Sequence, residues 1–309
     1  MIHLDGLTKR YKKADRNAVD GLSFDVRAGE FFALLGPNGA GKSTTISILT
    51  TTLSPTGGTA TIDGHDIVRE ASAVRRIVGI IFQRPSLDMN LTAEENVRFH
   101  AILYGLYPYA PSYGLMPAAY REQVQSLAKL LGIADEIQKP VRTFSGGMRR
   151  KLEIVRSLMH RPKVLFLDEP TAGLDVPSRR TLWEYLTAIR RDSGTTIFLT
   201  THYLEEAEEA DTICIIDKGK VVSFGTPARI KSDLVQEYVL IDAEDRPRLR
   251  QELGRLELRS DGEGPFRVHV DSRHTHAALK AIDTPLTLVR THMPSLEDAY
   301  LEIVGTVSE

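Results

Sequence analysis

Short apolar runs alternate with longer segments of helical periodicity over much of this chain. Residues 31–35, 78–82, 164–167 and 196–200 are mostly apolar and are bounded by glycine, proline or charged residues. Runs of this length without regular polar alternation are typical of strands buried on both faces of a parallel sheet. We therefore predict an α/β domain built around such a sheet.

The segment between the second and third runs, residues 84–163, has a different pattern. Apolar residues recur at helical spacing over 93–104, 119–131 and 147–159, which predicts an inserted helical subdomain. Prolines and a glycine in 107–114 prevent a continuous helix, so we expect an exposed loop there. The tyrosines of this loop leave two interpretations open: local packing, or docking of a partner, because tyrosine is enriched at interfaces.

The pattern changes again after Gly225-Thr226-Pro227, and we predict a domain boundary near residue 228. Residues 229–309 are expected to form a small α+β domain, with strands at 238–241 and 266–270 and helices at 247–256 and 295–304. The last helix has a start signal. Pro294 precedes Ser295 as the cap, and Asp298 follows at the spacing of a capping box.

Composition limits the possible functions. The 309 residues include 42% hydrophobic residues, and 39 Lys and Arg stand against 41 Asp and Glu, so no overall field favours nucleic acid or an anionic membrane surface. The single cysteine, Cys214, lies in an apolar run and is expected to be a buried, inert thiol, which fits a cytosolic compartment. No signal peptide or membrane span is expected from the apolar patterning.

Two charge runs invite a functional interpretation. One consists of Arg149, Arg150, Lys151, Arg156 and Arg161, and the other of Glu205, Glu206, Glu208 and Glu209. We interpret both as solvated faces that favour solubility, and we expect no nucleic-acid partner.

A phosphate-binding loop follows the first predicted strand. It reads Gly36-Pro37-Asn38-Gly39-Ala40-Gly41-Lys42-Ser43-Thr44 and leads directly into a helical run. Glycines let backbone N–H groups turn toward phosphate oxygens, and the helix adds its positive end at the same point. Lys42 can then reach the β- and γ-phosphates, and the Ser43 hydroxyl can ligate Mg²⁺. The loop predicts nucleotide binding.

Two adjacent acids, Asp168 and Glu169, end the apolar run 164–167. In parallel sheets catalytic groups collect at the carboxyl ends of strands, so we expect both acids to face the phosphate loop. Neighbouring strand residues point in opposite directions, so we divide the tasks: Asp168 holds Mg²⁺ through water, and Glu169 accepts a proton from the attacking water. A turn and helix cap is the alternative. His202, at the end of the next strand, would by itself be more typical of a structural residue.

The string Thr143-Phe144-Ser145-Gly146-Gly147-Met148 resembles the Leu-Ser-Gly-Gly-Gln signature of ABC transporter nucleotide-binding subunits. The order of the other motifs fits the same family over residues 2–228. They are the phosphate loop, a Q-loop glutamine at Gln83, the acids Asp168 and Glu169, a D-loop acid at Asp175 and an H-loop histidine at His202. Met148 replaces the signature glutamine, although the Ser-Gly-Gly that would meet phosphate is intact.

The resemblance implies an α/β P-loop NTPase (RecA-like) core with an inserted helical subdomain and a small α+β C-terminal domain. It implies ATP and Mg²⁺ as cofactors and a head-to-tail homodimer, or a pair with a sibling ATPase. Ser145, Gly146 and Gly147 would then meet the γ-phosphate of the other subunit's ATP. Within one chain, His202 would contact the γ-phosphate and Gln83 would sense metal and water. Tyr11 would stack on adenine, with core packing as the alternative.

The ending, residues 294–302, resembles the extension of export ATPases that serve drug resistance and other small-molecule export. That resemblance implies a separate transmembrane permease of the ABC-2 type and a peripheral place on the cytoplasmic face of the membrane. A drug, a lipid-like molecule or a glycan would be the cargo. An importer subunit and a soluble ABC ATPase acting on DNA or ribosomes are the alternatives.

Overall fold

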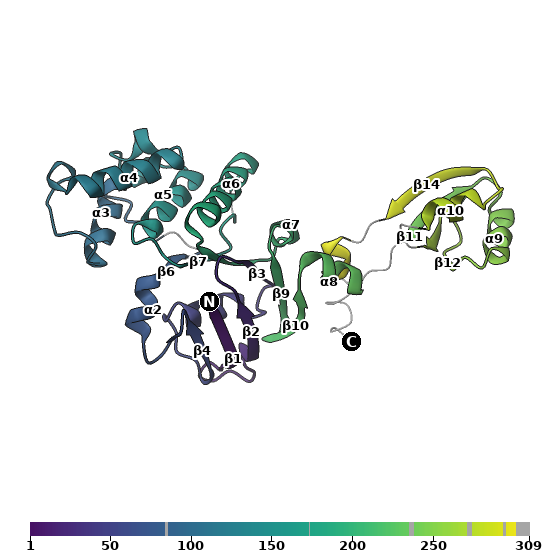
Figure 1. Cartoon of the computed structure of the whole chain (residues 1–309), viewed down its shortest axis with the longest axis horizontal. Coiled ribbons are helices and arrows are strands. Elements are labelled where there is room, and N and C mark those ends of the chain that lie inside the picture. Colours follow the sequence, from purple (N-terminus) through teal and green to yellow (C-terminus); the bar gives the residue numbers. More distant parts are fainter. Residues whose placement is uncertain (84–85, 173, 235–237, 271–273, 293–294, 301–309) are drawn as a thin grey trace. The chain divides into compact units, whose positions relative to one another are not determined.

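The chain divides into two compact units, Met1–Thr226 and Pro227–Glu309, each with its own hydrophobic core (Figure 1). A computed structural model describes residues 1–83, 86–172, 174–234, 238–270, 274–292 and 295–300. No helix among these described residues is long and apolar enough to cross a membrane.

A six-stranded sheet forms the centre of the first unit, in the order β10-β9-β3-β8-β7-β6. Its strands are β3 (Phe31–Leu35), β6 (Val78–Ile81), β7 (Val164–Asp168), β8 (Thr196–Thr201), β9 (Thr212–Asp217) and β10 (Lys220–Gly225). All pairings are parallel except that of β10 with β9. Every residue of β3, β7 and β8 is buried, because both faces of the sheet are covered. The prediction of a P-loop α/β fold is confirmed.

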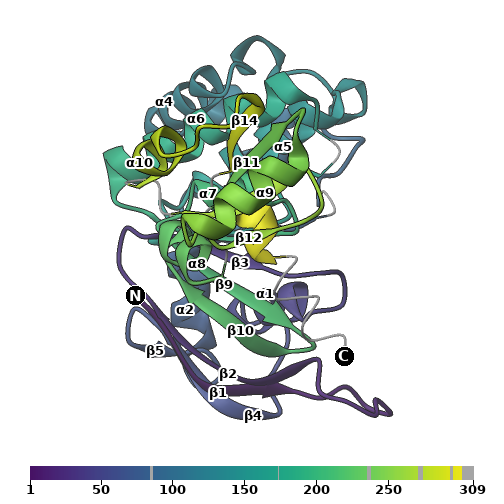
Figure 2. The same cartoon turned by 90° about the vertical axis from the view of Figure 1, so that its right-hand side faces the viewer.

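A second sheet, antiparallel and in the order β2-β1-β4-β5, was not expected from the sequence (Figures 1 and 2). It consists of β1 (Ile2–Lys9), β2 (Val19–Val26), β4 (Gly57–Ile62) and β5 (His65–Asp66). Its buried residues share one core cluster with the central sheet, and the ring centroids of Phe24 and Phe32 are 5.1 Å apart. The helices α1 (Lys42–Leu49) and α2 (Ala71–Ile77) belong to the same part of the chain.

The insertion between β6 and β7 is helical, as predicted. It contains α3 (Ala93–Leu103), α4 (Ala118–Leu130) and α5 (Gly146–Leu158), with short 3-10 turns at Tyr113–Leu115, Ala134–Glu136 and Val141–Thr143. A capping box at Thr92 and Glu95 starts α3. The helices α6 (Val176–Ser193) and α7 (Leu204–Glu208) follow β7 and β8.

The tyrosines of the loop 107–114 mostly pack locally. The Tyr107 hydroxyl donates to Gln123 at 2.9 Å, and the rings of Tyr107 and Tyr113 both meet the buried ring of Tyr120 edge-on. Only Tyr109 is largely exposed, at 70%. Tyr107 and Tyr113 therefore pack locally, and only Tyr109 stays exposed as a candidate for docking a partner.

The second unit begins with α8 (Pro227–Leu234) and continues in the order βαββαβ. Its elements are β11 (Tyr238–Ala243), α9 (Arg246–Arg255), β12 (Ser260–Asp261), β13 (Phe266–His269), α10 (Thr275–Lys280) and β14 (Leu286–His292). The antiparallel sheet β12-β13-β11-β14 has the ferredoxin-like arrangement. The predicted strands and first helix are present, whereas α10 and β14 were not predicted.

The predicted capping box of the last helix is formed. Ser295 N donates to Asp298 Oδ2 at 3.0 Å, and Asp298 N donates to Ser295 Oγ at 3.1 Å. The helix begins at Leu296, while Pro294 and residues 301–304 lie outside the described residues.

The prediction that the basic run and the acidic run are both solvated faces was partly wrong. Arg150 is 6% exposed and Glu206 only 2%, so neither run is simply a solvated face. Glu206 accepts hydrogen bonds from the hydroxyls of Thr171 and Thr201, and burial raises the pKa of its carboxyl. Cys214 is fully buried as predicted, and burial raises the pKa of its thiol.

Candidate functional site: a phosphate loop and a carboxylate cluster

The phosphate loop joins β3 to α1, and its path requires glycine at two points. A Cβ on Gly36 would lie 2.3 Å from the carbonyl oxygen of Ile216. Gly41 has φ 109°, and a Cβ there would lie 2.4 Å from the carbonyl oxygen of Ala18. No side chain caps the start of α1, so its first N–H groups are available to an anion.

Lys42 is held inside this loop. Its side chain is 5% exposed, and Nζ donates to the carbonyl oxygens of Gly36 at 2.7 Å and Pro37 at 3.2 Å. The same nitrogen lies 3.8 Å from Glu169 Oε1. Burial lowers the pKa of Lys42, while the charges of Glu169 and Asp168 act in the opposite direction. The carboxylates thus help to keep a buried ammonium charged.

Asp168, at the end of β7, is hydrogen-bonded both to the phosphate loop region and to the neighbouring strand β8. Its Oδ1 accepts hydrogen bonds from Ser43 Oγ at 3.2 Å and from Thr200 Oγ1 at 2.5 Å. Thr200 was not predicted as a site residue, although it stands two positions before His202 at the end of the same strand. Its hydroxyl fixes the orientation of the Asp168 carboxylate.

Glu169 gathers the remaining predicted groups. Gln83 Nε2 donates to its Oε2 at 2.8 Å, and His202 Nδ1 lies 3.1 Å from its Oε1. Lys42, Ser43, Gln83, Asp168, Glu169 and His202 are therefore brought together by direct contacts, although they come from distant parts of the sequence.

The backbone at Glu169 explains why two neighbouring acids face one site. The strand β7 ends at Asp168, and Glu169 has the left-handed φ of 45°, which is uncommon for a non-glycine residue. The alternation of a regular strand stops at this point, so the two carboxylates need not point in opposite directions. Both are buried, at 7% and 8% exposure.

The oxygen donors fit a hard divalent cation. Ser43 Oγ and the Asp168 carboxylate lie 3.2 Å apart at the edge of the loop, and Mg²⁺ prefers such oxygens. No cluster of three or more His, Cys, Asp or Glu that could enclose a metal occurs within the described ranges. At sites built from one or two such protein oxygens, Mg²⁺ usually keeps waters and shares ligands with substrate phosphates.

Tyr11 and Thr44 lie at the rim of the loop. The Tyr11 hydroxyl is 3.3 Å from Thr44 Oγ1, and Lys9 Nζ lies 5.8 Å from the ring centroid. Tyr11 is 46% exposed, so core packing is wrong for this residue. Asn38 and Gly39 are also exposed, whereas Ala40 is buried.

The signature and the D-loop acid take a different place. Ser145 caps α5 by accepting from Met148 N at 3.2 Å, and Asp175 caps α6 by accepting from Ser178 N at 2.8 Å. Hydrogen bonds from Ser178 lower the pKa of Asp175. Gly147 lies against α6, where a Cβ would come within 2.8 Å of Ser178 Oγ.

Within the described part of the chain, no hydrogen bond or ion pair joins Ser145, Gly146, Gly147 or Asp175 to the phosphate loop. The predicted site residues therefore form two separate groups.

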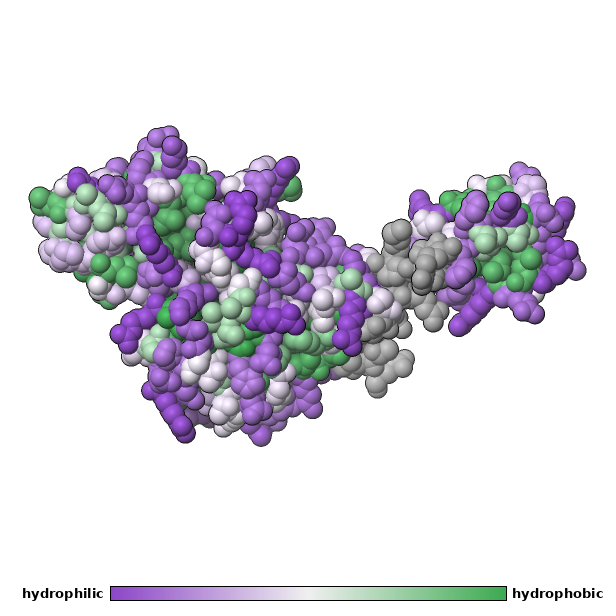
Figure 3. All heavy atoms as spheres, viewed as in Figure 1, coloured by the Kyte–Doolittle hydropathy of each residue, from purple (hydrophilic) through white to green (hydrophobic). Residues whose placement is uncertain are grey.

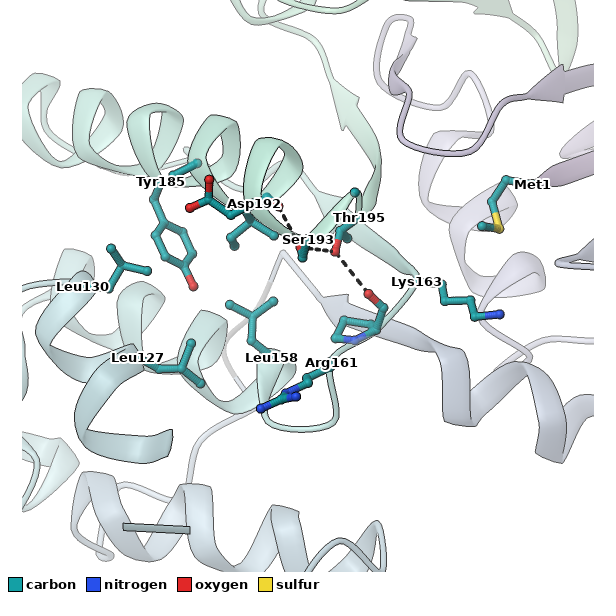
Figure 4. A pocket seen from close by; sticks show the side chains of 14 residues that line it. Met1, Leu127, Leu130, Leu158, Arg161, Lys163, Tyr185, Asp192, Ser193 and Thr195 are labelled. Atoms are coloured by element: carbon teal, nitrogen blue, oxygen red, sulfur yellow. Dashed lines mark hydrogen bonds between the residues drawn. The ribbon is translucent and has the colours of Figure 1, made fainter. Parts of the chain in front are cut away.

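An apolar cavity of about 660 Å³, seen from close by in Figure 4, is lined by none of the residues of these two groups. Its walls include Leu127, Leu158, Tyr185 and Ile189, and its floor reaches Lys163 and Thr195, just before β7 and β8. Asp168 and Glu169 stand at the other end of β7, so the cavity is not the phosphate site.

Comparison with known proteins agrees with this geometry. The sequence profile of the ABC transporter family matches residues 19–172. The chain is 39% identical to the daunorubicin/doxorubicin resistance ATP-binding protein DrrA of Streptomyces peucetius, over 98% of this chain and 92% of that relative. It is 38% identical to the Nod factor export ATP-binding protein I of Ralstonia nicotianae, over 99% and 94%.

A solved structure is similar in fold and in sequence. It is a dimeric ATP-binding cassette in a post-hydrolysis state, bound to ADP and Pi. The TM-score is 0.65 and the identity 27%, over 73% of this chain and 98% of the cassette.

Proposed function

Because the chain belongs to the ABC transporter family as an ATP-binding, ATP-hydrolysing subunit, we propose that it powers export as an ATP-closed dimer. The observation that carries this proposal is the separation of the two residue groups. Ser145–Gly147 stand at the start of α5, and among the described residues no hydrogen bond or ion pair joins them to the phosphate loop of their own chain. A second copy would supply them to the ATP.

Within each chain, the loop and the first turn of α1 would hold the phosphates, with Lys42 between the β- and γ-phosphates. Ser43 and Asp168 would hold Mg²⁺, which supplies charge neutralisation when bound. Glu169 would accept the proton of the attacking water, and Gln83 and His202 would orient that water and the γ-phosphate. Their hydrogen bonds to Glu169 support these roles. The exposed Tyr11 ring would stack on adenine.

Across the dimer, Ser145, Gly146, Gly147 and the N-terminal end of α5 would meet the γ-phosphate of the opposite subunit. Asp175 would lie at the same interface. Its exposure and its place beside Ser178, which also neighbours Gly147, support this.

The dimer is tested with Glu169→Gln, which should bind ATP but lose roughly a hundredfold or more in turnover, because a general base contributes that much. In MgATP its mass by light scattering should rise from the 34.4 kDa of one chain to about twice that value. Adding Gly146→Arg should prevent the increase, since Gly146 has open space around it and would face the partner. The matched control is Thr187→Arg, which introduces the same residue at an exposed position of α6.

Persistent monomers of Glu169→Gln in MgATP would contradict the dimer. Normal ATP turnover by the same variant would contradict the role of Glu169.

The helical insertion would dock a separate transmembrane permease of the ABC-2 type. Its surface carries exposed apolar side chains, among them Leu103 at 85%, Tyr109 at 70% and Leu115 at 68% (Figure 3). The relatives' roles in drug resistance and Nod factor export support export rather than import. The chain would then act at the cytoplasmic face of the membrane, on a drug, lipid-like or glycan cargo. Loss of cargo efflux in cells that carry Lys42→Ala, beside the same permease, would test this.

A further inference from the structure

The helix that carries the signature is bound along the free edge of the central sheet. Strand β6 is terminal in its sheet, so within the described ranges the carbonyl oxygens on its outer side have no strand partner. Ser157 Oγ donates to Ile80 O at 3.0 Å, and the His160 ring lies 2.8 Å from Val78 O. Arg150, nearest to the signature, donates to Phe82 O at 2.5 Å, immediately before Gln83.

Arg150 reaches further than the other two residues. Its Nε donates to the carbonyl oxygen of Pro170 at 2.9 Å, and Nη2 lies 3.4 Å from that of Asp168. The guanidinium also pairs with the buried Glu153 at 3.1 Å. One planar cation therefore binds backbone on both sides of Glu169 and next to Gln83.

Glu169 lies in the chain between Asp168 and Pro170, two of the three residues whose carbonyls Arg150 binds, and it adopts the left-handed φ of 45°. This conformation is unfavourable for a residue with a Cβ and persists only where the surroundings fix it. Glu169 N also donates to Thr200 O at 3.0 Å, which holds the other side of the same turn.

We propose that Arg150 is a positioning residue for ATP hydrolysis, which fixes Glu169 relative to the signature helix by binding the backbone carbonyls of Phe82, Asp168 and Pro170. The inference rests on the proposed role of Glu169. A planar fork with several donors suits this task, and lysine cannot reproduce it. Movement of α5 when a second subunit engages the signature would thereby reach the catalytic carboxylate.

Arg98 provides a matched control within the chain. It is also buried, at 3% exposure, pairs with a buried acid, Glu94, at 3.2 Å, and donates to a backbone carbonyl, that of Ala110, at 2.9 Å. No hydrogen bond or ion pair among the described residues joins these groups to the site. If turnover falls only because a buried arginine is disturbed, substitution of Arg98 should therefore lower it as much as substitution of Arg150.

The experiment compares Arg150→Lys with Arg98→Lys in the full chain, and measures MgATP affinity, turnover and thermal stability. We expect Arg150→Lys to bind MgATP like the unmodified chain and to hydrolyse it roughly tenfold to a hundredfold more slowly, as misplacement of a catalytic group does. Arg98→Lys should lose comparable stability and keep its turnover. Arg150→Gln, which loses the charge as well, should show the same separation of turnover from affinity.

A double-mutant cycle separates positioning from a general structural effect. If Arg150 acts through Glu169, Arg150→Lys should slow the residual turnover of Glu169→Gln hardly at all. An equal further loss in that background would overturn the inference, as would normal turnover of Arg150→Lys or an equal loss in Arg98→Lys. Normal turnover of Glu169→Gln alone would instead refute the proposed role of Glu169, so the two failures are distinguishable.

Discussion

At the scale of single residues, the site depends on one irregular turn. In a regular strand Asp168 and Glu169 would point to opposite faces. Because β7 ends at Asp168 and Glu169 turns left-handed, Asp168 meets Ser43 and Thr200 while Glu169 meets Lys42, Gln83 and His202. Two adjacent acids thereby acquire different partners, which is what a division between metal binding and proton transfer requires.

Lys42→Ala should lower ATP affinity by at least about tenfold, because the charge–phosphate contact is lost and a charge-assisted hydrogen bond contributes roughly 1.5–3 kcal/mol. The variant also leaves Glu169 without the cation at 3.8 Å. Equilibrium binding of a fluorescent ATP analogue measures the effect, and Lys129→Ala, an exposed change at the end of α4, is the control. Equal affinity of the two variants would contradict the assignment of the phosphate loop.

The sequence predicted the residues proposed to act on ATP better than the residues that hold them in place. Motif spacing identified Lys42 at the end of the glycine-rich loop, and it identified Asp168, Glu169 and His202 because they stand at or just after strand ends. Arg150 stood within a basic run, and nothing in that run distinguishes a guanidinium that meets buried backbone carbonyls from one in solvent. Its pairing with Glu153, three residues later on the same helix, was the available signal.

At the scale of elements, the phosphate loop offers a matched pair of glycines. Gly41 and Gly39 both have positive φ, at 109° and 82°, but a Cβ on Gly41 would strike the carbonyl oxygen of Ala18 and one on Gly39 would meet open space. We expect both alanine variants to bear about 1–2 kcal/mol of backbone strain. Gly41→Ala should lose more stability and more ATP affinity, because the start of α1 must also shift.

Chemical unfolding and nucleotide binding of the two loop variants check this prediction. If Gly39→Ala were the more damaging change, the close approach to Ala18 would not be what fixes the loop.

The sequence pattern predicted strands with both faces buried more readily than strands with only one buried face. Continuous apolar runs revealed β3, β6, β7 and β8. In β1 the buried and exposed positions alternate only at its start, and the pairing of β1 with β2 shifts register twice, so its period of two is interrupted. In β14 no residue is fully buried, so its sequence shows little difference between a buried apolar face and an exposed polar face. Both strands form by pairing with strands far along the chain, and the local sequence pattern does not identify them.

At the scale of the whole molecule, the chain carries two separate cores. Buried residues from Ile2 to Ile216 form the cluster around the central sheet, and another cluster, from Val239 to Val268, lies in the ferredoxin-like unit. The composition change after Pro227 indicated a boundary near the division at Thr226 and Pro227, whereas the ferredoxin-like order could not be predicted without α10 and β14. All residues proposed to bind ATP in this chain lie in the first unit.

The separate cores predict two unfolding transitions, of which ATP raises only one. A ligand that binds only the folded state at about 100 times its Kd stabilises it by about 2.7 kcal/mol, so the transition of Met1–Thr226 should rise by several degrees in MgATP. The transition of the ferredoxin-like unit should stay in place. In Lys42→Ala, at the same MgATP concentration, the transition of Met1–Thr226 should rise by no more than about half as much, which makes that variant the control in calorimetry. A single transition that shifts as a whole with MgATP would mean that the two units unfold together, and the second unit would then be part of the nucleotide-responsive structure.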